Sequence, residues 1–142
     1  MEIKATKYLD KQAFDLFFDQ NRLVEDYNEQ KDVGYFLYQG DQAIAFFSLI
    51  AVDDQKYWLR SLLMKRYAPL LLPVSIIQSA EQIATDQQAS YLVTHSTNTM
   101  LDDLFTQLGY KRTNQALDHS IEASWWITNL ANVDKNSSYT QV

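Results

Sequence analysis

Residues 58–110 read WLRSLLMKRYAPLLLPVSIIQSAEQIATDQQASYLVTHSTNTMLDDLFTQLGY, and this stretch decides the fold. Its apolar pattern predicts a strand over 58–64, a helix over 74–85, a strand over 91–94 and a helix over 98–108. A strand, a helix and a neighbouring strand form a crossover unit. The loop KRYAPLLLP (65–73) leads into a helix N-terminus, as phosphate-binding loops do, but it lacks glycine. The sequence thus predicts the frame of a phosphate site without its usual chemistry.

The flanking residues extend this unit into a mixed sheet. Asp10 suits the N-cap of a first helix that carries Phe14 and Phe17 on its apolar face, and the polar residues 21–32 are expected to form a loop or a short helix. The expected strands are 3–8, 35–38, 43–52, 57–64, 91–94, 110–113 and 120–128. This order predicts an α/β fold with a mixed, mostly antiparallel sheet and helices on both faces.

Length and composition predict the organisation of the chain. With 142 residues, a single domain is expected over residues 1–131, followed by a polar, flexible tail at 132–142. No apolar run approaches the roughly 20 residues that cross a membrane, and the N-terminus lacks the apolar core of a secretory signal. We therefore expect a cytoplasmic location. The absence of cysteine excludes disulfides, thiolate metal sites and thiol nucleophiles.

The charge pattern argues against several classes of partner. The net charge is −6, and the densest basic clusters are only residues 65–66 and 111–112. Because proteins that bind nucleic acid usually carry a basic stripe, we expect no nucleic-acid partner, and likewise no membrane partner. The two histidines lack the spacing of a metal site, so no metal is expected. No serine-hydrolase elbow, P-loop or dinucleotide-binding fingerprint is present.

The last helix of the opening stretch carries a second informative pattern. The run Asn98-x-x-Leu101-x-x-Leu104-Phe105-x-x-Leu108-Gly109-Tyr110 places an N-cap before an apolar face and a C′ glycine after it. Together with the element order and with Leu62-Leu63-Met64 before the loop, this run resembles the GNAT superfamily of acetyl-CoA-dependent N-acetyltransferases. The resemblance extends over residues 2–128.

The resemblance implies a fold in which two central strands splay apart. The pantetheine arm of acetyl-CoA would enter between them, and the loop before the crossover helix would hold the pyrophosphate through backbone N–H groups. By this resemblance the cofactor-binding residues are Leu63, Met64, Lys65, Arg66, Ala68, Leu70, Leu71 and Asn98.

Two features of the chain depart from the family pattern. Pro69 and Pro73 lie where the pyrophosphate loop normally has glycine, and each removes an N–H donor, although Pro73 suits the first turn of a helix. Leu71 keeps its N–H but adds a bulky side chain. Phe105 occupies the position of the family's general acid, often a tyrosine that protonates the departing thiolate, and a phenyl ring has no proton to give.

Two further catalytic roles follow from the resemblance and from side-chain chemistry. His95 stands at the C-terminal end of the strand 91–94, beside the expected gap, and histidine has the right pKa for a general base. A backbone N–H of the strand 62–64, assigned to Leu63, is expected to stabilise the oxyanion of the transition state.

Other acidic and phenolic side chains are weaker candidates for acid–base chemistry. Tyr67 and Tyr110 are considered as substitutes for the missing acid, and packing is the competing interpretation of both. Asp53 and Asp54 are interpreted first as turn residues, and Glu81 as an exposed helix position.

Two functions remain open at this stage. The first is an acetyl-CoA-dependent N-acetyltransferase acting on an amine that the sequence does not name. The second is a GNAT-fold protein that has lost transfer and serves as a binding or dimerisation module. The adjacent Trp125 and Trp126 point to opposite faces of the last strand, so we expect one in the core and the other against a helix, a partner or solvent. This pair has two further interpretations: both indoles are packed in the core, or the C-terminal strands form a homodimer.

Overall fold

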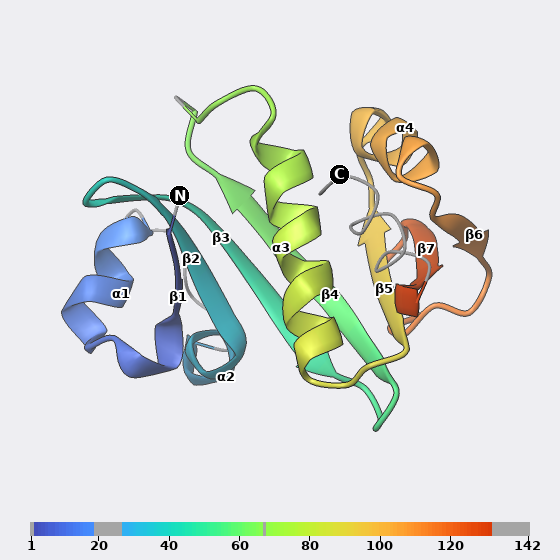
Figure 1. Cartoon of the computed structure of the whole chain (residues 1–142), viewed down its shortest axis with the longest axis horizontal. Coiled ribbons are helices and arrows are strands. Elements are labelled where there is room, and N and C mark those ends of the chain that lie inside the picture. Colours follow the sequence, from blue (N-terminus) through green and yellow to red (C-terminus); the bar gives the residue numbers. More distant parts are fainter. Residues whose placement is uncertain (1, 19–26, 67, 132–142) are drawn as a thin grey trace.

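The computed structural model describes residues 2–18, 27–66 and 68–131, which fold around one seven-stranded sheet of order β1-β2-β3-β4-β5-β7-β6 (Figure 1). The strands are β1 (Glu2–Ala5), β2 (Gly34–Gln39), β3 (Gln42–Ala51), β4 (Lys56–Met64), β5 (Tyr91–Ser96), β6 (Lys111–Thr113) and β7 (Ser124–Asn129). The helices are η1 (Thr6–Tyr8), α1 (Lys11–Phe17), α2 (Tyr27–Val33), α3 (Leu72–Asp86) and α4 (Thr99–Gln107).

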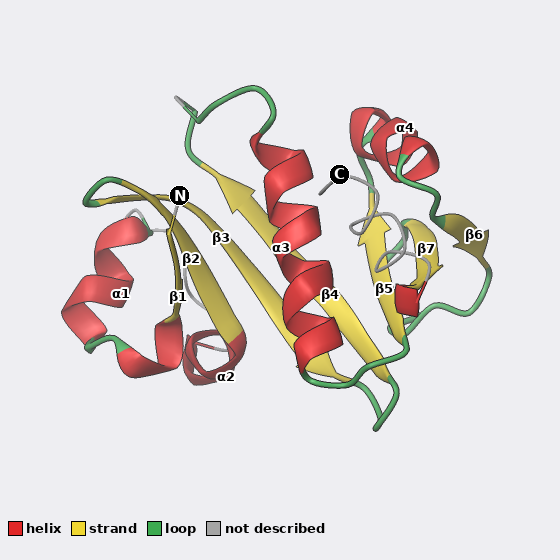
Figure 2. Ribbon diagram, viewed as in Figure 1, coloured by secondary structure: helices red, strands yellow, loops and turns green. Residues whose placement is uncertain are grey.

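All neighbouring strands run antiparallel except β4 and β5, which are parallel and joined through α3 (Figure 2). The predicted meander of β2, β3 and β4 and the predicted crossover from β4 to β5 are therefore confirmed. After β5 the chain forms α4 and β6 and then returns as β7, which pairs between β5 and β6. The sheet is mixed and mostly antiparallel, as the sequence indicates.

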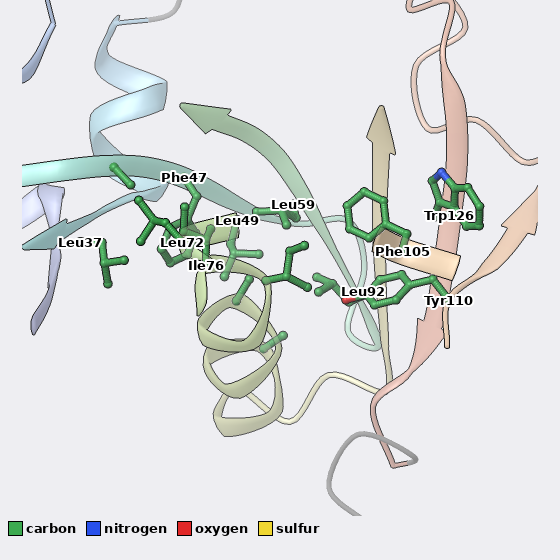
Figure 3. Packing of buried hydrophobic residues seen from close by; sticks show 14 of the residues in the cluster. Leu37, Phe47, Leu49, Leu59, Leu72, Ile76, Leu92, Phe105, Tyr110 and Trp126 are labelled. Carbon is green, nitrogen blue, oxygen red and sulfur yellow. The ribbon is translucent and has the colours of Figure 1, made fainter. Parts of the chain in front are cut away.

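The main hydrophobic cluster lies between the sheet and the helices α3 and α4. Leu37 and Phe47 point from β2 and β3 toward Ile76 of α3, and Phe105 of α4 extends the cluster toward β7 (Figure 3). We call this side of the sheet the α3 face.

Alternate residues of the same strands point to the opposite side, which we call the α1 face. Phe36 and Phe46 pack there against Phe14 and Phe17 of α1, and the rings of Phe14 and Phe36 stack at 5.7 Å between centroids. Helices therefore cover both faces, as expected, because β2 and β3 carry large apolar side chains at both odd and even positions.

The predicted helix caps are confirmed. Asp10 accepts a hydrogen bond from the Ala13 N–H at 2.8 Å, and Asn98 accepts one from the Met100 N–H at 2.8 Å. Gly109 follows α4 with φ +88°, a backbone conformation in which a side chain would be strained.

Some predicted boundaries were wrong. The strand expected over 3–8 ends at Ala5, because Thr6 turns inward and donates its hydroxyl hydrogen to the Lys31 carbonyl at 2.6 Å. The crossover helix begins two residues early, at Leu72, which keeps Pro73 in its first turn. The last strand begins only at Ser124, because a turn in which Asp118 accepts from the Ser120 N–H interrupts the segment. The expected tail at 132–142 lies outside the described residues.

Candidate functional site

The two central parallel strands separate before their C-terminal ends. β4 and β5 pair from Lys56 and Tyr91 to Leu59 and Thr94, and no further. Beyond this point β4 stays with β3, and β5 stays with β7, so the arrowheads of β4 and β5 point apart (Figure 1). At the end of the pairing the Thr94 hydroxyl donates to the Leu59 carbonyl at 3.0 Å. The predicted splayed strand pair is confirmed.

A β-bulge in β4 coincides with this separation. The β3 neighbours Ser48 and Leu49 pair with Ser61 and Leu59, so Arg60 is an extra residue on β4. A bulge bends its strand and increases the local twist. It therefore provides a physical cause for the departure of β4 from β5.

Helix α2 contacts the bulge through polar side chains. Arg60 Nη1 donates to Glu29 Oε1 at 2.8 Å, and Ser61 Oγ donates to Gln30 Oε1 at 3.4 Å. Arg60 also lies 5.5 Å from the ring of Trp58. The bulged residues are thus fixed from the α1 face.

Past the bulge, Leu62 and Met64 direct their backbone N–H groups toward the side that β5 has left. The Lys65 N–H donates to the Ile44 carbonyl at 2.9 Å, which fixes the alternation of the antiparallel ladder. Leu63, two residues earlier, has the same position in this ladder and turns its N–H toward β3. The assignment of the oxyanion donor to Leu63 is therefore corrected, because that N–H serves the sheet.

The N-terminus of α3 retains few donors for an anion. Of its first three residues, Pro73 has no N–H, and the other two donate within the loop. Their bonds are Leu72 N–H to the Pro69 carbonyl (3.0 Å) and Val74 N–H to the Leu71 carbonyl (3.2 Å). The poor anion grip that the prolines indicate thus has a geometric basis.

Exposed apolar side chains lie in the loop before α3 and at the end of β4. Leu70 is 92% exposed and Leu71 is 72% exposed, and Leu63 and Met64 at the end of β4 are also exposed. Ala68, in the same loop, packs partly against the main cluster.

The basic residues of the loop differ in their surroundings. Lys65 Nζ donates to the Phe17 carbonyl at the end of α1 at 2.5 Å and lies 4.5 Å from the Phe17 ring centroid. A cation is favoured there by the helix dipole. Arg66 is exposed. The structure therefore gives Lys65 a partner away from the N-terminus of α3.

His95 sits beside the separation, on the α1 face, between two indole rings. Trp58 Nε1 donates to His95 Nδ1 at 3.1 Å, and the His95 ring lies 4.8 Å from that of Trp125. Burial lowers the pKa of His95, and the Arg60 guanidinium lowers it further, while Asp118 opposes them. A neutral imidazole has one nitrogen that accepts a hydrogen bond and one that carries the proton. Because Nδ1 accepts from Trp58, Nε2 carries the proton. His95 is thus poised as a donor and must release Trp58 to act as a base.

A buried acidic pair occupies the α3 face. Tyr110 donates its hydroxyl hydrogen to Glu81 Oε2 at 2.6 Å, and the two residues are 4% and 5% exposed. Burial raises the pKa of Glu81, which the Tyr110 hydrogen bond partly offsets, and burial beside Glu81 raises the pKa of Tyr110 well above its ordinary value. The interpretation of Glu81 as an exposed helix position was wrong.

Phe105 lies in the same cluster, 1% exposed, with its ring 5.1 Å from that of Tyr110. Neither residue is arranged to give a proton to a leaving group, because Phe105 has none and the hydroxyl of Tyr110 is bound to Glu81. Tyr67 lies outside the described residues.

Trp125 and Trp126 point to opposite faces, as predicted, and both are buried. Trp125 packs with Trp58 and Val93 on the α1 face, whereas Trp126 joins the main cluster and donates from Nε1 to Asp102 Oδ1 at 3.0 Å. Both indoles are therefore packed within the chain.

Asn98, assigned to cofactor binding by resemblance, uses Oδ1 to cap α4, and its N–H donates to Ser96 Oγ at 2.9 Å. Within the described ranges no group of three or more His, Asp or Glu side chains could hold a metal ion. None of the helices in the same ranges is both long and apolar enough to span a bilayer.

The fold is that of the GNAT acetyltransferases. The chain superposes on an N-acetylglutamate synthase from Neisseria gonorrhoeae complexed with coenzyme A and N-acetyl-glutamate, with TM-score 0.68, 12% identity, and coverage of 91% of this chain but 35% of that one. It matches the Campylobacter jejuni N-acetyltransferase PseH in complex with acetyl coenzyme A with TM-score 0.64, 11% identity, and coverage of 90% and 97%. A GNAT-family acetyltransferase from Listeria monocytogenes gives TM-score 0.62, 11% identity, and coverage of 84% and 77%. No protein-family model and no curated protein matches the sequence.

Sequence reasoning missed the bulge and the residues around it. Arg60 was a detectable signal, because it is a charged residue within an otherwise apolar stretch of β4. Glu29 lies 31 residues from Arg60 along the chain, and His95 lies 37 residues from Trp58. No local sequence pattern therefore predicts either contact.

Proposed function

We propose that this chain is a divergent GNAT acyltransferase that moves an acetyl group from a pantetheine thioester to an amine. The observation that carries the proposal is the separation of β4 from β5 at the Arg60 bulge, with the N–H groups of Leu62 and Met64 on the vacated side. Solved structures of this fold that hold coenzyme A or acetyl coenzyme A support it.

The unpaired edge of β4 would serve as the donor-binding element. Pantetheine contains two amides, and an extended amide chain can hydrogen-bond to a free strand edge much as an added strand does. The N–H groups of Leu62 and Met64 would bind this arm and stabilise the thioester oxygen as it gains negative charge. They are held in position by the ladder with β3, so little reorganisation accompanies the reaction.

Transfer forms a C–N bond to the amine and breaks the C–S bond of the thioester. The amine loses one proton and the thiolate gains one. Since Phe105 and Tyr110 give no proton to the sulfur, water would supply it, which a leaving thiol with a pKa of about 8.5 tolerates near neutral pH. His95 stays the candidate base, with release of the Trp58 hydrogen bond as the required first step.

The amine would approach from the α1 face. α3 and α4 cover the other side of the sheet, whereas Arg60 and His95 lie on the α1 face next to the separated strands. Both side chains are hydrogen-bond donors in this arrangement, so an acceptor that presents oxygen atoms beside its amine would be recognised there.

Release of thiol from acetyl-CoA in the presence of a panel of amines tests the proposal. The chain has no cysteine, so a thiol reagent reports only the product. The informative variant is Met64→Pro, which removes an N–H that the ladder with β3 does not use. Met64→Ala is its matched control, because it keeps the N–H. Met64→Pro should lower the rate by about 10²-fold, the usual effect of losing one oxyanion donor, with Met64→Ala near the parent.

The alternative is a non-catalytic GNAT-fold binding or dimerisation module. The proton-free Phe105 and the occupied N–H groups at the start of α3 favour it. Binding of acetyl-CoA without thiol release for any amine would support this alternative. A dimer through the C-terminal strands would use β6, the three-residue edge of the sheet, since both indoles of β7 are buried within the chain. Sedimentation of the chain with substitutions in β6 would test that contact.

A further inference from the structure

We infer that this chain recognises its acyl donor through the pantetheine arm and not through the diphosphate, so that it accepts acyl-pantetheine thioesters that carry no nucleotide. The inference rests on the proposed function and specifies the donor of the same site.

The half of the site that would bind pantetheine is intact. β4 is unpaired on its β5 side after Leu59, and its N–H groups at Leu62 and Met64 face that side. The exposed Leu63 and Met64 side chains place apolar surface beside this edge. An uncharged arm with amides and methyl groups is complementary to such a surface.

The half of the site that would bind a diphosphate does not fit that group. A diphosphate at a helix start needs several N–H groups directed at its oxygens. Here Pro73 has none, and Leu72 and Val74 donate to loop carbonyls. The exposed Leu70 and Leu71 add apolar side chains to the loop that precedes this helix start.

Charge does not replace the missing donors. Lys65 is bound to the end of α1, so it does not serve the start of α3. Arg66 is exposed, and an exposed cation gives a weak attraction that salt screens. The net charge of −6 opposes the approach of a polyanionic nucleotide.

The experiment compares acetyl-CoA with acetyl-pantetheine in the thiol-release assay and in a direct binding assay with the full chain. We expect kcat/KM and Kd for the two donors to agree within about threefold. Neither should weaken as salt rises, because no attractive phosphate contact is involved. A preference for acetyl-CoA of about thirtyfold or more would overturn the inference.

The outcomes separate the inference from the proposed function. Equal use of both donors supports both, and use of acetyl-CoA alone leaves the function in place and refutes the inference. If neither donor binds, the proposed function itself is refuted.

A loop variant tests the cause. The double variant Pro69→Gly, Pro73→Gly restores two N–H groups, and circular dichroism and a melting curve confirm that it folds. It should gain affinity for acetyl-CoA and show no gain for acetyl-pantetheine. An unchanged ratio of the two affinities would show that the prolines do not determine donor choice.

Discussion

The buried hydrogen bond between Tyr110 and Glu81 offers a strong test of the structure. The Tyr110→Phe substitution removes only the hydroxyl that donates to Glu81 Oε2 at 2.6 Å, within a region where both residues are about 5% exposed or less. A hydrogen bond to a carboxylate contributes roughly 1.5–3 kcal/mol, and no water can replace it easily at this depth. For a domain of 142 residues this corresponds to a fall in Tm of about 5–10 °C.

The assay is urea denaturation at 25 °C, with Tyr8→Phe as the matched control because Tyr8 is 81% exposed. The control should retain the stability of the parent. The pH dependence gives a second readout. Since burial raises the pKa of Glu81 above its ordinary value of 4.5, the folded chain binds that proton more tightly. Stability from this group is therefore full below pH 4.5 and is lost as pH rises through the raised pKa. The Glu81→Gln variant should lack this loss. If Tyr110→Phe equals the parent in stability, the buried pair does not exist as described.

Three further predictions concern the packing and the site. Gly34→Ala should destabilise the fold by about 1–3 kcal/mol in urea denaturation, because its Cβ would contact Phe46 Cε1 and lie 2.7 Å from the Gln30 carbonyl oxygen; parent-like stability would contradict the packing of α2 on β2. Thr94→Val should lower the free energy of unfolding by about 1 kcal/mol in the same assay, since it leaves the Leu59 carbonyl without its 3.0 Å donor. An unchanged stability would show that this hydrogen bond does not stabilise the point where β4 and β5 separate. His95 should titrate by NMR below its ordinary pKa of 6.5, so that its contribution to stability is present above pH 6.5 and lost as pH falls through the lowered pKa; a midpoint at or above 6.5 would refute its burial beside Arg60.

Much of the fold could be predicted because its signals are local. The helical spacing of Leu101, Leu104 and Phe105 and the caps at Asp10 and Asn98 depend on residues no more than four positions apart, and the structure confirms them. The element boundaries near Thr6 and Ser124 were wrong because distant or irregular hydrogen bonds decide them.

The candidate site was predictable only in outline. The two prolines in the loop indicated a weak anion site from composition alone, since proline has no N–H in any fold. The choice among Leu62, Leu63 and Met64 as donor was not predictable, because it depends on the register that the Arg60 bulge imposes on β4.

The sequence by itself determined the order of elements, the crossover between β4 and β5 and the loss of donors at Pro69 and Pro73, because periodicity and covalent chemistry act within a few residues. Only the tertiary structure decided that Lys65 binds the end of α1 and that His95 accepts from Trp58. It also decided that Glu81 is buried with Tyr110. Each of these contacts joins residues 29 to 48 positions apart, and their partners are set by which faces the sheet brings together.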